Sequence, residues 1–573
     1  MRILFLTSAH NGLSQRLQTE LEELGHRVTV ELALSAATME SAARVARPDL
    51  IVCPMLTRRI PESVWRHHTC LIVHPGIVGD RGPASLDWAI LNRESTWGVT
   101  VLQAGAELDG GDIWATEELP MRFASKAGIY RIEVTEAATR AVLNAVRRFE
   151  NRTYRPRPLD HSAPGVRGVA RPAVRVTERR IDWGASTEDV LRVLFSATSA
   201  PGVLDEVAGE ELFVYGGWAE GALRGTPGSI LDRRHGAVCR ATGDGAVWLS
   251  HARRPGRSSF KLPAAVALKD APTSLPRLAS GHSNGNGRDR TSHGTFRELS
   301  YREDLNLGIA FLRFDFSNGA MTTSQCIRLL GALRAAGRRP TRVLVLQGGD
   351  EFWSNGINLA TIEASRDPAG EAWRNIGALD DIVAEIIRMT SKIVIAAPHG
   401  NAGAGGVPLA LAADHVWCRR GVVFNPHYRA MGGLFGSEYW TYLLPRRVGP
   451  ELTRVLVDGM QPLGMPRALD LGLIDEVRDA VNGSFDQWVR ERASELASDP
   501  RLEELIARKA ESRAVDEDRK PLRRYREEEL AEVATQFFDP EHPFHQARRD
   551  FVRKRPPQGT PLHFARHHTN LWW

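Results

Sequence analysis

Residues 71–83 read Leu-Ile-Val-His-Pro-Gly-Ile-Val-Gly-Asp-Arg-Gly-Pro, and this stretch determines how we expect the N-terminal part of the chain to fold. The apolar run from Cys70 to Val73 predicts a short buried strand that delivers His74. The glycines and prolines that follow hold the backbone in a fixed, non-repetitive loop, and Ser85 is a suitable N-cap for the next helix. Open α/β sheets place their ligands at the carboxyl ends of strands, so His74 is a candidate catalytic residue.

A second motif, Leu-Asp-Gly-Gly-Asp-Ile at residues 108–113, supplies the expected partner of His74. We expect the strand that begins near Gly98 to end in Asp109, where a carboxylate can orient the imidazole and stabilise its cation. A single His-Pro pair more often marks a structural turn. Here, however, His-Pro, Arg-Gly-Pro, Leu-Asp-Trp-Ala-Ile, Gly-Val-Thr and Asp-Gly-Gly-Asp-Ile follow one another in this order.

Together these motifs resemble the folate-dependent formyltransferases over residues 1–270. The resemblance implies that His74 and Asp109 form the catalytic pair and that N10-formyl-tetrahydrofolate is the formyl donor. It also implies that backbone groups of two loops hold the pterin, at Leu56, Arg58, Ala106 and Leu108. One departure is Ile72, because the family carries an asparagine two residues before the histidine. The amide donor to the formyl oxygen is therefore missing, which argues against ordinary transfer to an amine.

The bulk composition is that of a globular protein with several domains. A chain of 573 residues is too long for one hydrophobic core, and three or four domains are expected. No apolar run approaches the length of a membrane span, and residues 1–7 are too short for the apolar part of a signal peptide. The five cysteines are scattered, which argues against a disulfide framework or a zinc site and favours a reducing, cytoplasmic location.

The charge balance bears on the class of partner. A net charge of +5 is small for this length and suits anionic small molecules, such as coenzyme A or a folylpolyglutamate, as well as it suits nucleic acid. The sequence contains no nucleic-acid-binding motif. We therefore expect small-molecule substrates, and neither a nucleic acid nor a membrane, as partners.

The order of strands and helices predicts a multidomain α/β protein. Residues 1–155 alternate apolar strands with amphipathic helices, which predicts a doubly wound parallel sheet. No Gly-x-Gly-x-x-Gly follows the first strand, which argues against a dinucleotide site. Residues 165–270 contain short strands and glycine turns, and they resemble the C-terminal domain of the formyltransferases, a small open β-barrel. The Gly/Ser/Asn-rich segment at 276–298 is expected to be a flexible linker.

A second α/β pattern occupies residues 300–480. Two glycine-rich turns, at 352–357 and 399–406, each open a helix and point free backbone N–H groups at any oxyanion placed there. Either turn alone is weak evidence, because glycine turns are common. The ordered pair resembles the crotonase (enoyl-CoA hydratase/isomerase) superfamily over residues 305–480. The resemblance implies a ββα spiral, coenzyme A as a cofactor, and oxyanion donors on the N–H groups of Ile357 and Gly405.

The polar residues of the crotonase-like pocket depart from the family pattern. Its two hydratase glutamates fall on Pro408 and Tyr428, so simple hydration of an enoyl-CoA is not expected. Tyr428, Glu438 and Tyr439 remain as groups able to move a proton, although Tyr428 can also be a packed core tyrosine and Glu438 a helix-surface charge. The resemblance also assigns coenzyme A contacts to Ser354 and Asn355.

The last region, residues 481–573, is predicted to be helical. Its basic pairs alternate with acidic residues, which is typical of a solvated face, although they could instead contact the phosphates of coenzyme A. The aromatic-rich end from His563 to Trp573 is too apolar to hang free in solvent. We expect this end to dock on another domain.

A formyl-folate module fused to a crotonase module resembles the HypX (HoxX) family of hydrogenase-maturation proteins over nearly the whole chain. The resemblance implies that the formyl group of formyl-tetrahydrofolate passes to coenzyme A, and that formyl-CoA then breaks down to carbon monoxide and coenzyme A. Other hydrogenase-maturation proteins would then receive the carbon monoxide. Two alternatives stay open: a formyl-folate hydrolase or sugar-nucleotide formyltransferase with an inactive second half, and a scaffold that binds both ligands without turnover.

Overall fold

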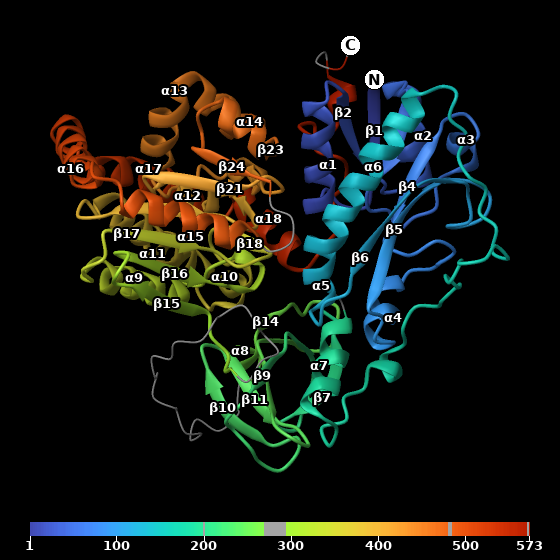
Figure 1. Ribbon diagram of the computed structural model, residues 1–573, viewed down its shortest axis with the longest axis horizontal. Coiled ribbons are helices and arrows are strands. Elements are labelled where there is room, and N and C mark those ends of the chain that lie inside the picture. The colour runs from blue at the N-terminus through green and yellow to red at the C-terminus, as the bar shows by residue number, and fades with distance from the viewer. Residues whose placement is uncertain (199–200, 269–293, 480–483, 570–571, 573) are drawn as a thin grey trace. The chain divides into compact units, whose positions relative to one another are not determined.

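The computed structural model describes residues 1–198, 201–268, 294–479, 484–569 and 572, and the chain divides into two compact units (Figure 1). Unit 1 consists of residues 1–296 and 556–573, and unit 2 of residues 297–555. The region predicted as a C-terminal helical segment is thus divided between the two units. Most of the predicted linker at 276–298 lies outside the described residues. Within the described residues, no helix is long and apolar enough to cross a membrane.

The N-terminal part of unit 1 is built on a six-stranded sheet in the order β2-β1-β3-β4-β5-β6. The strands are β1 (Arg2–Thr7), β2 (Arg27–Leu32), β3 (Leu50–Cys53), β4 (Cys70–His74), β5 (Thr96–Gln103) and β6 (Ile113–Pro120). The first four are mutually parallel, whereas β5 runs antiparallel to β4 and β6 antiparallel to β5. The predicted α/β class and parallel sheet are confirmed, with an antiparallel edge that the sequence did not indicate.

Successive residues of β1 are apolar and buried, so helices must cover both faces of this sheet. Side chains on a strand point alternately to opposite faces. Phe5 accordingly packs with α1 (Gly12–Glu23) and α6 (Thr135–Glu150), whereas Leu4 packs with α2 (Ala36–Ala46) on the other face. The result is a helix–sheet–helix arrangement, with α6 lying across the sheet in Figure 1. Shorter helices complete the region: α3 (Glu62–Trp65), α4 (Ser85–Leu91) and α5 (Lys126–Ile129).

The second part of unit 1 contains two four-stranded antiparallel sheets, in the orders β10-β11-β12-β9 and β14-β13-β8-β7. The strands are β7 (Val203–Val207), β8 (Glu210–Tyr215), β9 (Trp218–Glu220), β10 (Ile230–Arg234), β11 (Ala237–Ala241), β12 (Ala246–Leu249), β13 (His251–Arg253) and β14 (Leu262–Pro263). Helices α7 (Thr187–Ser196) and α8 (Ala264–Ala267) pack on them. Short strands joined by glycine turns thus form the open barrel-like layer that the sequence predicts.

Unit 2 winds as the ββα spiral that the sequence predicts, in which a six-stranded sheet is accompanied by a smaller four-stranded one. The larger sheet contains β15 (Leu299–Asp304), β16 (Ile309–Phe314), β17 (Val343–Gln347), β19 (Ile393–Ala397), β21 (His415–Arg419) and β24 (Glu476–Arg478). The smaller contains β18 (Phe352–Ser354), β20 (Asn401–Gly403), β22 (Val423–Asn425) and β23 (Leu463–Gly464). From β17 to β22, each successive turn of the chain contributes one strand to each sheet, which brings the two glycine-rich turns side by side.

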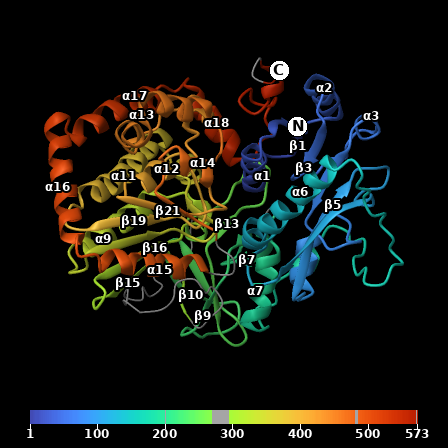
Figure 2. The same cartoon turned by 45° about the horizontal axis from the view of Figure 1, so that its top comes forward.

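The helices of unit 2 pack on these sheets and around their outside (Figure 2). They are α9 (Thr323–Gly337), α10 (Leu359–Ala364), α11 (Pro368–Arg388), α12 (Gly406–Leu411), α13 (Trp440–Gly459), α14 (Met465–Asp470), α15 (Ser484–Ala497), α16 (Leu502–Arg519), α17 (Leu522–Phe538) and α18 (Pro543–Val552). Helix α17 lies against both α11 and α13. It therefore delivers side chains to the interior of the site described below.

The last residues of the chain return to unit 1. Strand β2 is an edge strand of the N-terminal sheet, and the Val30 N–H donates a hydrogen bond of 3.0 Å to the Phe564 carbonyl. The side chain of Trp572 is only 1% exposed, and its indole N–H donates to the Ala46 carbonyl at 2.9 Å. The expectation that this aromatic end docks on a domain is confirmed.

Candidate functional site

The first candidate site surrounds His74 at the carboxyl end of β4. Its imidazole is 5% exposed and lies between two carboxylates. Nε2 forms a 2.9 Å hydrogen bond with Asp80 Oδ2, and Nδ1 lies 3.7 Å from Asp109 Oδ2. A carboxylate on each side stabilises the imidazolium form and fixes the plane of the ring. The group is therefore suited to accept a proton and to return it.

Asp109 reaches this position by a different route from the one predicted. Strand β5 ends at Gln103, so the expectation that the strand ends in Asp109 was wrong. Residues 104–112 form a loop that folds back, and Asp109 adopts a left-handed backbone with φ of 51°. The Gly82 N–H donates to its carboxylate at 3.4 Å, which joins this loop to the loop that follows His74.

Asp80 was not predicted to belong to the site. Its side chain is 1% exposed, and its Oδ1 has no hydrogen-bond partner among the described residues, so His74 is the partner that compensates its burial. The loop of residues 75–83 was recognised as rigid from its glycines and prolines. An aspartate inside a rigid loop after a candidate catalytic histidine was the signal that could have found it.

The segment between the two parts of unit 1 closes over this loop. Arg81 forms an isolated bridge with Ala170, and the Arg171 N–H donates to the Arg81 carbonyl at 2.9 Å. A Cβ on Gly168 would lie 1.9 Å from the backbone nitrogen of Asp80, so only glycine fits there. Residues 168–171 therefore hold the loop of residues 75–83 in place as well as connecting the two parts of unit 1.

The predicted folate contacts lie in two loops that touch each other. Arg59 donates to the carbonyl of Ala106, so Arg59 rather than Arg58 connects the two loops; the Arg58 side chain is exposed. Leu56 is half-buried against the α2 side of the sheet, and Leu108 is 57% exposed. An exposed leucine beside a loop carbonyl offers an apolar surface to a flat ring.

Ile72 occupies the position where the formyltransferases carry an amide. It lies in β4 opposite Cys53 on one neighbouring strand and Leu102 on the other, and its side chain is half-buried. Its surroundings on both strands are apolar. No side-chain donor is provided at this position.

We expect Gly76→Ala to disrupt this site more than the fold. A Cβ at residue 76 would lie 2.4 Å from His74 Nε2 and 2.5 Å from Asp80 Oδ2, so the methyl group must separate the two side chains. Consumption of formyl-tetrahydrofolate should fall by about 10²-fold or more, the range typical of losing a positioned acid–base group. Steady-state assays with circular dichroism as a folding control measure this. Gly105→Ala is the matched control, because a Cβ there has no atom within 4 Å, and equal activity of both variants would contradict the role of the hydrogen bond.

The second candidate site, in unit 2, begins with the two glycine-rich turns. Gly356 has φ of 74°, and a Cβ on it would lie 3.2 Å from the nitrogen of Gly405, so the two turns are in contact. Within the described part of the chain, neither the Ile357 nor the Gly405 N–H donates a hydrogen bond. The two predicted oxyanion donors are therefore adjacent and available.

The side chains assigned to coenzyme A contacts mainly shape this turn. Ser354 is fully buried and accepts the Gly356 N–H at 3.1 Å. The Asn355 amide donates to the Asn318 carbonyl at 2.7 Å. The Ser354 hydroxyl is therefore not accessible to a ligand, and only residues next to it could make such a contact.

Tyr428 and Glu438 meet directly beside the oxyanion turn. The Tyr428 hydroxyl donates to Glu438 Oε2 at 3.0 Å, and the two side chains are 3% and 2% exposed. A Cβ on Gly405 would lie 2.3 Å from Glu438 Oε1, which places the carboxyl group against this turn. Burial raises the pKa of Glu438 to about 7, although the hydrogen bonds from Tyr428 and from the Ser437 N–H lower it. The surface position that the sequence left open for Glu438 is thus excluded.

Glu438 is held in a strained turn. Its φ is 64° and that of Tyr439 is 58°, two successive left-handed residues that are not glycine. The Glu438 N–H donates to Asp380 Oδ1 at 2.8 Å, and the Tyr439 N–H donates to Glu529 Oε2 at 2.9 Å. The Ser437 hydroxyl bonds both of these carboxylates. Two buried acids therefore fix the turn that aims Glu438.

Asp380 and Glu529 were not predicted, because they come from α11 and α17, far apart in the sequence. Burial and the nearby charges of Glu438 and Glu529 raise the pKa of Asp380 well above its ordinary value, and Arg526, 3.5 Å away, offsets part of this. Burial raises the pKa of Glu529 to about 7. Three carboxyl groups thus share one enclosed site and will not all be ionised at neutral pH.

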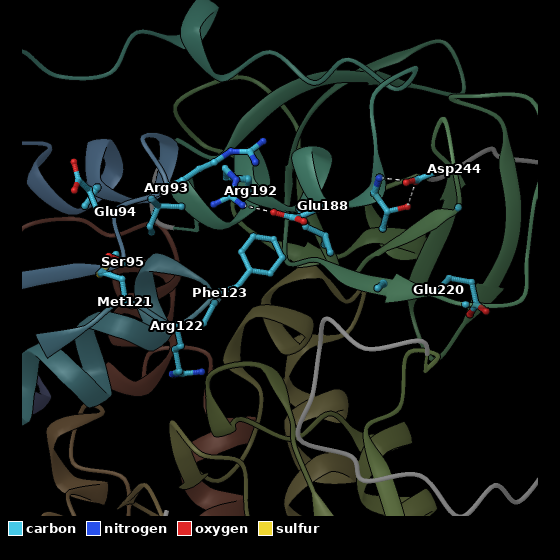
Figure 3. Close-up of a pocket in the computed structure, with 18 of the residues that line it drawn as sticks. Arg93, Glu94, Ser95, Met121, Arg122, Phe123, Glu188, Arg192, Glu220 and Asp244 are labelled. Atoms are coloured by element: carbon cyan, nitrogen blue, oxygen red, sulfur yellow. Dashed lines mark hydrogen bonds and ion pairs between the residues drawn. The ribbon is translucent and has the colours of Figure 1, made fainter. Parts of the chain in front are cut away.

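A cleft of about 580 Å³ in unit 1 is separate from the His74 site (Figure 3). It is lined by the end of α4, by residues 121–124, by α7 and by the turns around residues 221 and 244. The Arg192 guanidinium lies 4.9 Å from the ring centroid of Phe123 and pairs with Glu188. Neither His74 nor the two carboxylates beside it, Asp80 and Asp109, line this cleft.

Known families account for most of the chain. Residues 1–146 match the model described as formyl transferase, residues 174–267 that described as formyl transferase, C-terminal domain, and residues 309–560 that described as enoyl-CoA hydratase/isomerase. The methionyl-tRNA formyltransferase of Ruegeria pomeroyi is 25% identical over 240 residues, which cover 41% of this chain and 76% of that protein.

Two relatives match over the full length. The hydrogenase maturation factor HoxX of Bradyrhizobium diazoefficiens is 44% identical over 568 residues, 99% of this chain and 97% of that protein. The crystal structure of HypX from Aquifex aeolicus in complex with tetrahydrofolic acid is 42% identical, with a TM-score of 0.94 over 99% of each chain. Both modules and their order are therefore shared with these two proteins.

Proposed function

This chain belongs to the family of the hydrogenase maturation factors HoxX and HypX, and on that premise we propose that it makes the carbon monoxide ligand of the [NiFe]-hydrogenase active site. Its substrates are N10-formyl-tetrahydrofolate and coenzyme A. Its products are tetrahydrofolate, carbon monoxide and free coenzyme A. The Aquifex aeolicus relative crystallised with tetrahydrofolic acid, and the crotonase-like fold of unit 2 supports coenzyme A as the second substrate.

The first step of the proposal is carried by His74 in unit 1. His74 takes the thiol proton of coenzyme A and returns it to N10 of the folate, so that the C–N bond breaks as the C–S bond forms. Asp80 and Asp109 stabilise the imidazolium that exists between the two transfers. Formyl-CoA and tetrahydrofolate result, without an external oxidant or reductant.

The second step is carried by unit 2. The N–H groups of Ile357 and Gly405 hold the thioester oxygen, while Glu438 removes the formyl proton. The electrons of the C–H bond remain on carbon, the C–S bond breaks, and Glu438 returns the proton to sulfur. Formyl-CoA has no α-carbon, so the enolate chemistry typical of the crotonase fold is not available to it.

A single observation carries this proposal: a carboxyl group with a pKa of about 7 lies against an oxyanion turn that has two available donors. Pro408 and Tyr428 stand where the hydratases carry glutamates, which leaves Glu438 as the buried base at this turn. A base that titrates near neutrality is suited to remove a proton and then give it back.

The test is incubation of the purified full chain with formyl-tetrahydrofolate and coenzyme A, with carbon monoxide trapped by reduced haemoglobin. The proposal predicts carbon monoxide in proportion to the folate consumed, and none when coenzyme A is omitted. Formate in place of carbon monoxide would support the formyl-folate hydrolase instead. Binding of both ligands without consumption of either would support a scaffold and contradict the proposal.

We further propose that the protein works in the cytoplasm and passes carbon monoxide to another maturation protein, with no role for nucleic acid or membrane. The absence of paired cysteines supports a reducing compartment. Pull-down from cells that are assembling hydrogenase, with a variant inactive at Glu438 as control, tests for the recipient. A recipient recovered equally with an unrelated protein of similar charge would contradict this proposal.

Ile72→Asn is expected to change the fate of the formyl group rather than the rate of its release. An amide at this position restores a donor to the formyl oxygen, which favours transfer to amines or water over transfer to coenzyme A. The measurement is the ratio of formate and formyl-amine to carbon monoxide per folate consumed. Ile72→Leu serves as a control that keeps the side chain apolar, and an unchanged ratio in Ile72→Asn would mean that the lost amide is irrelevant.

A further inference from the structure

Glu31, His567 and His568 form a side-chain cluster in unit 1 that the proposed reaction does not use. Glu31 lies near the end of β2, and the two histidines lie in the turn Arg566–His568 of the C-terminal segment. One ligand atom from each residue lies within 4.8 Å of the other two. Glu31 is 6% exposed and His567 1% exposed, whereas His568 is exposed.

One ring nitrogen of His567 is buried without a hydrogen-bond partner among the described residues. Its Nδ1 lies 2.8 Å from the Thr29 hydroxyl, which is itself 3.3 Å from the Phe564 carbonyl. When Thr29 donates to that carbonyl, Nδ1 carries the proton and Nε2 keeps a free electron pair. Nε2 is buried and has no hydrogen-bond partner among the described residues, although Glu31 Oε2 lies only 3.3 Å away. In that tautomer two electron-rich atoms face each other at this distance, and a cation bound by both would remove their repulsion.

We propose that Glu31, His567 and His568 bind a divalent transition-metal ion of the zinc class. Zinc takes carboxylate oxygen and imidazole nitrogen at about 2.0–2.2 Å, so two tetrahedral ligands are separated by about 3.3–3.6 Å. The 3.3 Å between His567 Nε2 and Glu31 Oε2 agrees with this separation. The fourth position, beside exposed His568, is left for water.

The surroundings match those of metal ligands. A ligating histidine usually donates its other ring N–H to a fixed acceptor, and Thr29 provides one for His567. The Thr560 hydroxyl donates to Glu31 Oε1 at 2.6 Å, which orients that carboxylate.

This ion would fasten the C-terminal segment to the edge strand of the folate-binding unit. Imidazole with one carboxylate suits zinc or nickel better than calcium or magnesium, which prefer oxygen ligands alone. The scattered cysteines argued against a zinc site. The proposed site departs from that expectation, because its three ligands include no cysteine.

The test is calorimetric titration of Zn²⁺ into the full chain after removal of metal by a chelator. Wild type should bind one ion, and His568→Ala should bind it at least about tenfold more weakly, because even the loss of an outer-shell partner costs about 10–100-fold. His568 is exposed, so this variant should fold. His67→Ala, in the adjacent pair His67-His68 of the same unit, is the matched control and should bind as wild type does.

A second readout separates binding at this cluster from binding elsewhere. Zn²⁺ should slow proteolysis within residues 556–569 of wild type and of His67→Ala, but not of His568→Ala or Glu31→Gln. No stoichiometric Zn²⁺ binding to wild type, or equal binding to wild type and His568→Ala, would overturn the proposal. The pair of Glu31 and His567 would then be only an imidazolium–carboxylate contact.

Discussion

Replacing Glu438 by glutamine should slow the release of carbon monoxide from formyl-CoA by about 10²–10⁴-fold, the usual contribution of a positioned acid–base group. Coenzyme A affinity should stay within a few-fold of wild type, because glutamine keeps the size and the hydrogen bonds of the side chain. Single-turnover assays with formyl-CoA as substrate separate this step from the chemistry of unit 1. Glu451→Gln, at an exposed position on α13, is the control and should retain full activity.

Two companion experiments sharpen this prediction. Tyr428→Phe removes the hydrogen bond to Glu438 Oε2 and should also slow carbon monoxide release, with a shifted dependence on pH. In wild type the rate should rise as pH increases through about 7, because Glu438 must be ionised to accept the formyl proton. Normal rates in both variants would mean that unit 2 only holds coenzyme A and that the chemistry takes place at His74.

Loss of the imidazole in His74→Ala should reduce the consumption of formyl-tetrahydrofolate by about 10²–10⁴-fold. Asp109→Asn and Asp80→Asn should each have a smaller effect in the same direction, because they weaken the stabilisation of the imidazolium without removing it. Absorbance at the wavelength of free tetrahydrofolate measures the loss of the formyl group. His161→Ala, in an exposed loop, is the control.

The three substitutions also distinguish the two carboxylates. Asp80 hydrogen-bonds Nε2 whereas Asp109 lies 3.7 Å from Nδ1, so Asp80→Asn should disturb the ring orientation more. Folate affinity, measured by fluorescence quenching, should be nearly unchanged in all three. Wild-type turnover in His74→Ala would remove this site from the mechanism.

Local pattern was sufficient to predict the strands and the loop around His74. The run of apolar residues before His74 and the glycine-rich loop after it are local signals, and both features appear where they were expected. The position of Asp109 was misjudged because its loop folds back from Gln103, and such a reversal depends on contacts with residues such as Gly82. Those contacts join residues that are distant in the sequence, so motif spacing alone does not predict them.

The interior of the second site was harder to predict for the same reason. Tyr428 was singled out because it stands where the crotonases carry a glutamate, and Glu438 because it follows nearby, but their hydrogen bond was not foreseen. Asp380 and Glu529 are buried acids on helices that carry several other charged residues, so nothing in their local sequence distinguishes them. Only the packing of α17 against α11 and α13 brings them to the turn.

The return of the C-terminal segment to strand β2 has a consequence for the synthesis of the protein. Because chains emerge from the ribosome N-terminus first, β2 must wait until the whole of unit 2 has been translated before Phe564 and Trp572 can cover its side of the sheet. During that interval an unpaired edge is open to pairing with other nascent chains. A chain that stops within unit 2 would lack the segment that covers this edge, which makes it more prone to aggregate.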